Sequence, residues 1–125
     1  MGSINLPEVE TDNFDIHISG AGDINIDALY ADRLNAELSG LGDVDIDGGE
    51  VNFLNVHISG SGTFSARKME SNEADVRVSG LGSATVRVAD YLDARISGVG
   101  DINYYGRPEL DVDISGLGNL HSLDD

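Results

Sequence analysis

Aspartates recur at regular intervals in this 125-residue chain, and regularly spaced carboxylates could bind a cation. Asp23 and Asp43 occupy equivalent places in a repeated pattern, and Asp45 follows Asp43 on the same segment. Stacked carboxylates repel one another, and a hard cation such as Ca²⁺ would relieve that repulsion. The spacing, however, is not the glycine-rich nonapeptide of calcium-binding β-helices. Asp23, Asp43 and Asp45 are therefore only weak calcium candidates, and a solvated acidic face is the simpler interpretation.

Catalysis by these groups is not favoured. Acid–base work on glycans needs a long cleft built by extended loops and a raised pKa on one acid. The segments between apolar runs here are only a few residues long. His17 and His57 lie two repeats apart, roughly 10 Å at the spacing of paired strands, which is too far to share a zinc ion. His121 lies elsewhere in the pattern. We expect no enzymatic activity, no cofactor and no metal centre.

The amino-acid composition limits the kinds of molecule that the chain could bind. The formal net charge of −16 argues against nucleic acid or an anionic membrane and favours cations or basic partners. The chain has no cysteine, so disulfides are excluded. No apolar run is long enough to span a bilayer, so we expect no membrane insertion. No signal peptide is visible, although Met1-Gly2-Ser3 could be a cloning remnant that stands in place of one.

One short motif, Ser-Gly-x-Gly, organises the rest of the chain. It occurs six times, with first glycines at Gly20, Gly40, Gly60, Gly80, Gly98 and Gly116. The period is 20 residues and then 18. Self-similarity at such a fixed period predicts a repeat architecture.

Apolar and polar residues alternate on both sides of each motif. Two residues before the first glycine stand Ile18, Leu38, Ile58, Val78, Ile96 and Ile114. Four residues before it stand Ile16, Ala36, Val56, Val76, Ala94 and Val112. Period-two alternation rich in β-branched residues predicts half-buried strands. Each repeat thus carries two clear strands joined at Ser-Gly-x-Gly and closes with a third, less regular segment.

These observations predict an all-β fold, a right-handed parallel β-helix of about six coils with 18–20 residues per coil and no helix. Each coil would pair with the next, and the interior would be a column of Ile, Leu and Val. Residues 1–12 would form a lead-in, in which Pro7 suits an edge position. Residues 13–125 would form a single β-helix domain.

The residue between the two glycines has two possible places. These residues are Ala21, Leu41, Ser61, Leu81, Val99 and Leu117. If the alternation continues through the corner, they point outward as an apolar stripe, and such stripes mark contact surfaces. If the turn breaks the alternation, they fill the corner of the core. The glycines themselves would allow a corner too tight for side chains, and would supply positive φ if the turn needs it.

The segment 101–108 departs from the repeat. Tyr104 falls at an inward position, where we expect its ring to fill a widening core. Tyr105 should then point outward. With Arg107 it could form a small contact spot.

The repeated units resemble the family of putative auto-transporter adhesins with a "head GIN" domain. The resemblance runs from about Leu6 to Leu120, and its most specific piece is Gly98-Val99-Gly100-Asp101 followed by Tyr104-Tyr105-Gly106-x-Pro108. It implies a right-handed β-helix in a bacterial cell-envelope or extracellular protein with an adhesion role. The family commonly has Ser between the glycines and further upstream coils, so this chain resembles the C-terminal portion of the domain.

Two classes of function follow. The first is a non-catalytic surface or adhesion module that binds a protein or glycan ligand. The second is a self-assembling structural scaffold, because a β-helix end without a cap is a template for association between copies. We therefore also expect a homo-oligomer, formed through the coil end or the apolar stripe.

Calcium provides the first test. If the aspartates form a solvated acidic face, millimolar CaCl₂ should leave the melting temperature unchanged relative to NaCl of equal ionic strength. A calcium-specific rise in melting temperature that disappears in Asp43→Asn would contradict this expectation and identify a bound cation.

Overall fold

The computed structural model describes residues 3–122, which form a β-solenoid of about six turns. Its strands are β1 (Ser3–Glu10), β2 (Asn13–Ile18), β3 (Asp23–Leu38), β4 (Asp43–Ile46), β5 (Gly49–Ile58), β6 (Thr63–Val78), β7 (Ser83–Ile96), β8 (Asp101–Tyr105), β9 (Glu109–Ile114) and β10 (Asn119–Ser122). They pair in parallel in one ten-stranded sheet, and no helix occurs between residues 3 and 122. The all-β parallel architecture predicted from the repeats is confirmed.

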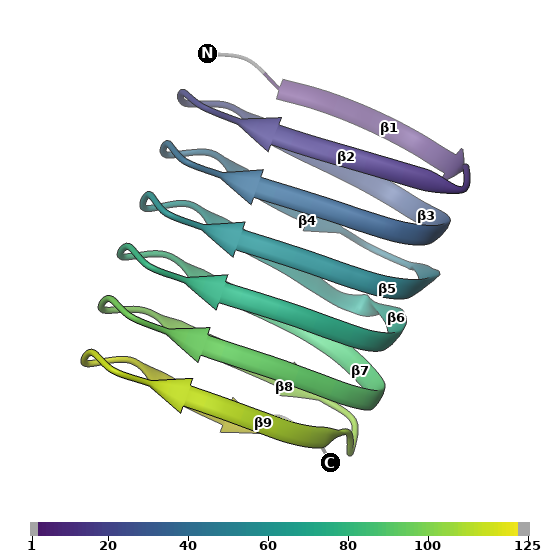
Figure 1. The fold of residues 1–125 in the computed structure, drawn as a ribbon. Coiled ribbons are helices and arrows are strands. Elements are labelled where there is room, and N and C mark those ends of the chain that lie inside the picture. The colour runs from purple at the N-terminus through teal and green to yellow at the C-terminus, as the bar shows by residue number, and fades with distance from the viewer. Residues whose placement is uncertain (1–2, 123–125) are drawn as a thin grey trace.

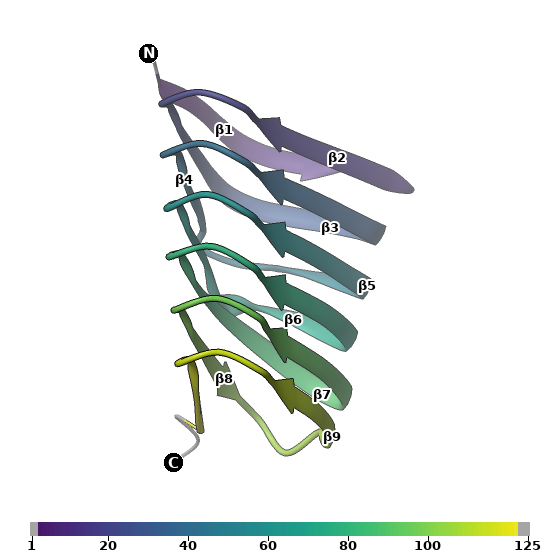
Figure 2. The same cartoon turned by 60° about the vertical axis from the view of Figure 1, so that its left-hand side comes forward.

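The chain winds between two rows of strands (Figure 1). The front row contains β2, β5, β9 and the second halves of β3, β6 and β7, and the other row lies behind it. The Ser-Gly-x-Gly corners join the front row to the back row along one edge, and wider bends join them along the other. Figure 2 shows the corners of successive coils stacked above one another. Residues one repeat apart are therefore neighbours in space.

Residues 3–10 of the predicted lead-in form a full strand. β1 pairs with β3 from Ser3 opposite Asp23 to Glu10 opposite Tyr30. It stands at one end of the strand order, so one side of it has no strand neighbour among the described residues. Pro7 lies in this edge strand, where its missing N–H does not interrupt a ladder on that side. The edge position predicted for Pro7 is confirmed.

In β6 the third segment of the repeat is a continuation of the strand around two bends. Along β6 the alternation of buried and exposed residues breaks at Arg67-Lys68 and again at Asn72-Glu73, where two successive residues are exposed. Each break turns the strand while Met69 and Ser71 between them still face inward. The irregularity that we read in the sequence thus marks bends of the coil.

The change of period from 20 to 18 residues removes one of these bends. β7 has a single break, at Ala89-Asp90. The register between β6 and β7 shifts on both sides of Glu70, which pairs with Arg87. The shortened coil remains stacked on the coil before it, because β6 and β7 stay paired on either side of the shift.

The core is a stack of apolar columns. Leu34, Leu54 and Leu92 are at most 2% exposed and lie in one column, in which Ala74 stands between Leu54 and Leu92. Tyr104 is 9% exposed, which confirms its predicted inward position. Ser71 is the one buried polar residue of the described chain, and its hydroxyl donates to the Arg87 carbonyl oxygen at 2.7 Å. The core therefore satisfies the one polar side chain that it contains.

The corners require glycine for space. A Cβ added to Gly60 would collide with the carbonyl oxygen of Gly40 in the preceding coil, and one added to Gly62 would collide with the carbonyl oxygen of Gly42. Positive φ is not the reason, since only Gly49 and Gly106 of the described residues have it. The backbones of successive corners approach too closely for any side chain to lie between them.

This packing predicts a position-dependent cost of alanine. Gly60→Ala should lower the free energy of unfolding by about 1–3 kcal/mol, because the new methyl group meets stacked backbone that cannot move aside. Gly20→Ala is the matched control, because a Cβ there meets nothing within 4 Å. It should change stability by about 0.5 kcal/mol or less. Urea unfolding followed by circular dichroism measures both, and equal losses in the two variants would contradict the account.

Candidate interaction surfaces

The residues between the glycines form an exposed line, here called the corner ridge: Ala21, Leu41, Ser61, Leu81, Val99 and Leu117. Leu41 and Leu81 are each 67% exposed, Val99 49% and Leu117 78%. The residues between the two glycines therefore point outward and do not fill the corner of the core. The second glycine of each motif faces inward, as where Gly62 packs over Leu38, and so the residue before it points away from the core.

Backbone hydrogen bonds fix the ridge in place. The amide of Leu41 donates to the Gly20 carbonyl oxygen at 2.9 Å, and the amide of Leu81 donates to that of Gly60 at 3.0 Å. The same bond recurs at each later corner of the described chain. The ladder of the solenoid thus continues through the turns, and the ridge side chains project from backbone that is bonded to its neighbour.

Of the three calcium candidates, only Asp23 and Asp43 lie directly opposite each other. Thr63 follows Asp43 in the column, and the amide of Thr63 donates to the Asp43 carboxylate at 3.2 Å. Asp45 lies between Asn25 and Ser65 in its own column. Within residues 3–122, no group of three or more His, Cys, Asp or Glu side chains is placed to hold a metal ion.

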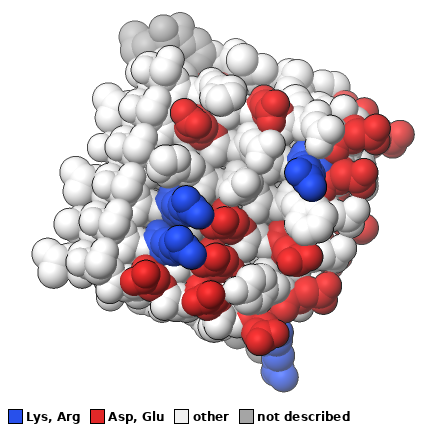
Figure 3. All heavy atoms as spheres, in the orientation of Figure 1, with Lys and Arg blue, Asp and Glu red and all other residues white. Residues whose placement is uncertain are grey.

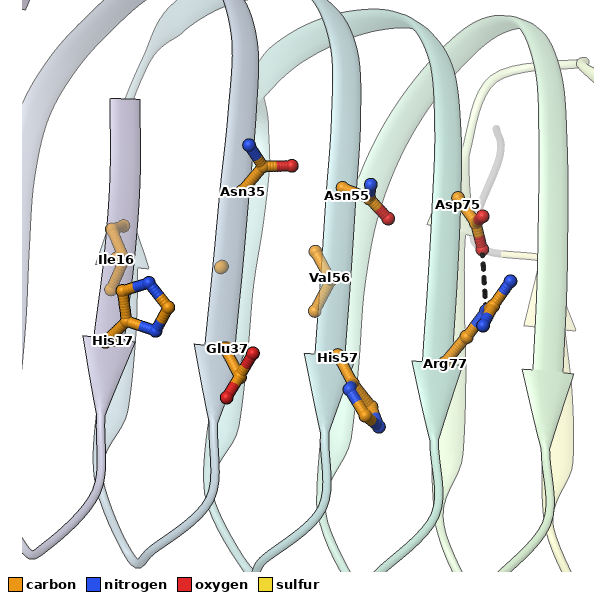
Figure 4. Close-up of a pocket in the computed structure, with 10 residues that line it drawn as sticks. Ile16, His17, Asn35, Glu37, Asn55, Val56, His57, Asp75 and Arg77 are labelled. Atoms are coloured by element: carbon orange, nitrogen blue, oxygen red, sulfur yellow. Dashed lines mark ion pairs between the residues drawn. The ribbon is translucent and has the colours of Figure 1, made fainter. Parts of the chain in front are cut away.

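The front row carries mixed charges. Figure 3 shows acidic and basic side chains over the front strands, whereas the edge with the corners carries neither on this face. One column of the front row contains His17, Glu37, His57 and Arg77. Glu37 therefore lies between the two histidines, which are two coils apart as the sequence repeat predicted. These side chains line a depression of about 370 Å³ (Figure 4), which also contains the ion pair of Arg77 with Asp75, 3.5 Å between Nε and Oδ1.

A second depression of the front row, about 300 Å³ in volume, is here called the Phe53 hollow. The residues that line it are Arg33, Asn35, Phe53, Leu54, Asn55, Glu73, Ala74, Asp75, Tyr91 and Asp93. The Phe53 ring is 46% exposed, and the Arg33 guanidinium lies over it, 5.5 Å from the ring centroid. The hollow thus combines an exposed aromatic ring with amide and carboxylate groups.

Tyr91 forms the far wall of this hollow. Its hydroxyl donates to Asp111 Oδ2 at 3.2 Å. Partial burial raises the pKa of the Tyr91 hydroxyl, and the hydrogen bond to Asp111 and the neighbouring carboxylates of Asp93 and Glu109 raise it further. The Tyr91 hydroxyl therefore stays protonated at neutral pH and acts as the donor in this hydrogen bond.

The C-terminal contact spot is partly formed. The Arg87 guanidinium stacks on the Tyr105 ring at 4.8 Å from its centroid, and Arg87 Nε also donates to the Arg67 carbonyl oxygen at 2.8 Å. Arg107 lies at an exposed position after Gly106. Arg87 lies opposite Tyr105 in the regular 18-residue register between β7 and β8, so Tyr105 has a partner that the sequence analysis did not name.

The Phe53 hollow escaped the sequence analysis. Its rings occupy the column seven residues before the first glycine: Asn13, Arg33, Phe53, Glu73, Tyr91 and Glu109. That column follows the bend, where alternation does not settle which way a side chain points. Two aromatic residues in an otherwise polar column were the available signal.

Solved structures share this fold. A putative adhesin from Bacteroides fragilis NCTC 9343 is 28% identical, with a TM-score of 0.89 over 95% of this chain and 56% of that one. A putative lipid binding protein from Parabacteroides distasonis ATCC 8503 is 25% identical, with a TM-score of 0.81 over 97% of this chain and 52% of that one. This chain spans about half the length of both.

A putative adhesin from Parabacteroides merdae ATCC 43184, 20% identical with a TM-score of 0.79 over 95% of this chain and 57% of that one, supports the fold alone. No curated protein matches the chain. Among the described residues, no helix is long and apolar enough to cross a membrane.

The family model described as "Putative auto-transporter adhesin, head GIN domain" matches residues 1–108, which include the Tyr-Tyr-Gly-x-Pro segment and five of the six Ser-Gly-x-Gly motifs. The resemblance inferred from those motifs is therefore confirmed, and the chain belongs to the head GIN domain family of putative auto-transporter adhesins.

Proposed function

We propose that this chain is a non-catalytic interaction module of the bacterial cell envelope or surface that adheres to a protein partner through the corner ridge. The observation that carries the proposal is the exposure of Leu41, Leu81 and Leu117, each at least 67% exposed on hydrogen-bonded corners. Membership of the adhesin family and likeness to adhesin structures support a surface role.

The ridge suits docking because its side chains need little ordering. They project from stacked corners whose backbone amides are bonded to the coil before. A partner that covers them gains the transfer free energy of apolar surface, about 25 cal/mol per Å², and loses little backbone entropy on this side of the interface. On the face shown in Figure 3, the edge with the corners carries no charged side chain.

The absence of catalysis is part of the proposal and rests on shape. The depressions of the front row lie on strands of the solenoid, and the connections between described strands are short. Enzymes that act on glycans build clefts from long loops around two positioned carboxyl groups. The carboxylates here instead follow the repeat and bond to neighbouring coils, as Asp15 does with Asn35 at 2.9 Å.

A self-assembling scaffold is the second candidate. It is favoured by the last coil, where Leu110, Val112 and Ile114 on β9 are 41%, 41% and 39% exposed. The corresponding residues of the preceding coil, including Leu92, are buried by a neighbour on each side. A second copy stacked on β9 would bury this surface and pair the edge that has no strand neighbour among the described residues, giving a homo-oligomer.

Ridge variants separate the two candidates. Leu41→Asp with Leu81→Asp should keep the fold, because both side chains are exposed, and should weaken adhesion about tenfold or more, since each buried leucine contributes about 1.5–3 kcal/mol. The matched control is His17→Asp with His57→Asp, which adds the same two carboxylates on the front row. Adhesion of protein-coated beads to bacterial and epithelial cell layers, with circular dichroism for folding, gives the comparison.

Equal adhesion by the ridge variant and the wild type would contradict the proposal that the corner ridge mediates adhesion. No adhesion by wild-type beads would contradict the adhesion role itself. Sedimentation velocity over a range of concentrations completes the test. Concentration-dependent oligomers of the wild type, without adhesion, would favour the scaffold.

A further inference from the structure

We propose that the Phe53 hollow binds an uncharged, extended glycan chain. The ligand would lie across the front strands, parallel to the solenoid axis, with sugar rings stacked on Phe53 and Tyr91. This assigns a ligand class to a surface distinct from the corner ridge, so it adds to the proposed surface role without depending on the ridge.

The aromatic rings supply the apolar contact. Phe53 is 46% exposed on the front row, whereas the next residue, Leu54, is 2% exposed and belongs to the core. The Arg33 guanidinium lies 5.5 Å from the centroid of the Phe53 ring and the Tyr91 hydroxyl donates to Asp111 Oδ2 at 3.2 Å, and these contacts restrict the motion of the two rings. A sugar ring has one face of C–H groups that packs on such an aromatic surface at little entropic cost.

The spacing of the rings suits a polymer. Phe53 lies opposite Glu73, and Glu73 lies opposite Tyr91, so the two rings are two coils apart. At the spacing of paired strands this is roughly 10 Å, close to the length of a disaccharide unit. In an extended β-1,4-linked chain every second ring presents the same face, so alternate sugars would meet Phe53 and Tyr91.

The polar groups between the rings suit hydroxyl groups. Asn55 lies in the column next to that of Phe53, and Asp75 and Asp93 follow it in the next two coils. Amides both donate and accept hydrogen bonds, and carboxylates accept two or more each, which is the complement of a hydroxyl-rich ligand. Asn55 in particular presents donor and acceptor in one plane.

The charges of the hollow select against acidic sugars. Glu73, Asp75 and Asp93 line it, and Arg33 is its one basic lining residue among those described. Arg77 and Arg95 pair with Asp75 and Asp93 from outside the hollow, at 3.5 Å and 3.4 Å. A uronic acid would bring a further carboxylate against Glu73, whereas a neutral hexose or N-acetylhexosamine would not.

Titration by NMR, observed on the amides of the ¹⁵N-labelled chain, tests the proposal. Cellohexaose and chitohexaose are the neutral extended probes, and a galacturonic acid hexamer is the charged one. We expect amide shifts around Phe53 and Tyr91 with the neutral probes and none with the charged probe. Phe53→Leu, which keeps apolar bulk but removes the ring, should weaken binding about tenfold, and Phe53→Trp should retain it.

Tyr30→Ala is the matched control, because Tyr30 is 42% exposed but does not line the hollow, and it should bind as the wild type does. The ridge variant Leu41→Asp with Leu81→Asp should also bind normally, which separates this site from the ridge. The proposal is overturned if neither neutral probe binds, if Phe53→Leu and Phe53→Trp bind equally, or if the galacturonate probe binds as tightly as the neutral ones.

Discussion

The contact of glycine backbone on glycine backbone at the Ser-Gly-x-Gly corners is the constraint on which the structure depends. Gly60 packs against the Gly40 carbonyl so closely that no Cβ fits between them. The amide of the next residue, Ser61, bonds the same carbonyl at 3.0 Å. Each coil is therefore locked to the one before at its tightest turn, and the stack is stable only as a stack. The same contact forces the intervening side chain outward, so the rule that builds the fold also builds the corner ridge.

Stacking identical positions brings carboxylates close together, and the chain offsets part of this repulsion with amides in some columns and with ion pairs where Asp75 and Asp93 stack directly. In a chain of net charge −16, carboxylates in one column would lie one coil apart. Asn35 donates instead to Asp15 at 2.9 Å, and Asn52 donates to Asp32 at 3.0 Å. The front row consequently alternates charge, amide and aromatic ring rather than forming a purely acidic wall. That mixture gives the Phe53 hollow its recognition chemistry, on a surface that the coils hold rigid.

The sequence repeat made the fold predictable, but it did not predict the direction of side chains at the corners and bends. Alternation assigns Leu34, Leu54 and Leu92 to the core because strand side chains alternate strictly. Alternation does not assign side chains where the backbone bends, so it left both an inward and an outward position possible for Leu81. The glycine contacts in the structure distinguish the two. Alternation also missed Phe53, whose column begins at a bend and repeats no residue type. The contact of Arg87 with Tyr105 follows the 18-residue period, but periodicity places the two residues side by side without showing that the guanidinium stacks on the ring.

The most direct test of this account uses the absence of cysteine from the chain. Single variants Leu81→Cys and Leu92→Cys place one thiol on the ridge and one in the core, where Leu92 is fully buried. Labelling of the native proteins with a maleimide should be fast at position 81, at nearly the rate of the urea-unfolded chain, and slow at position 92. Protection at position 81 comparable to that at position 92 would show that the corners do not turn these side chains outward, and would contradict the ridge and the stacking that produces it.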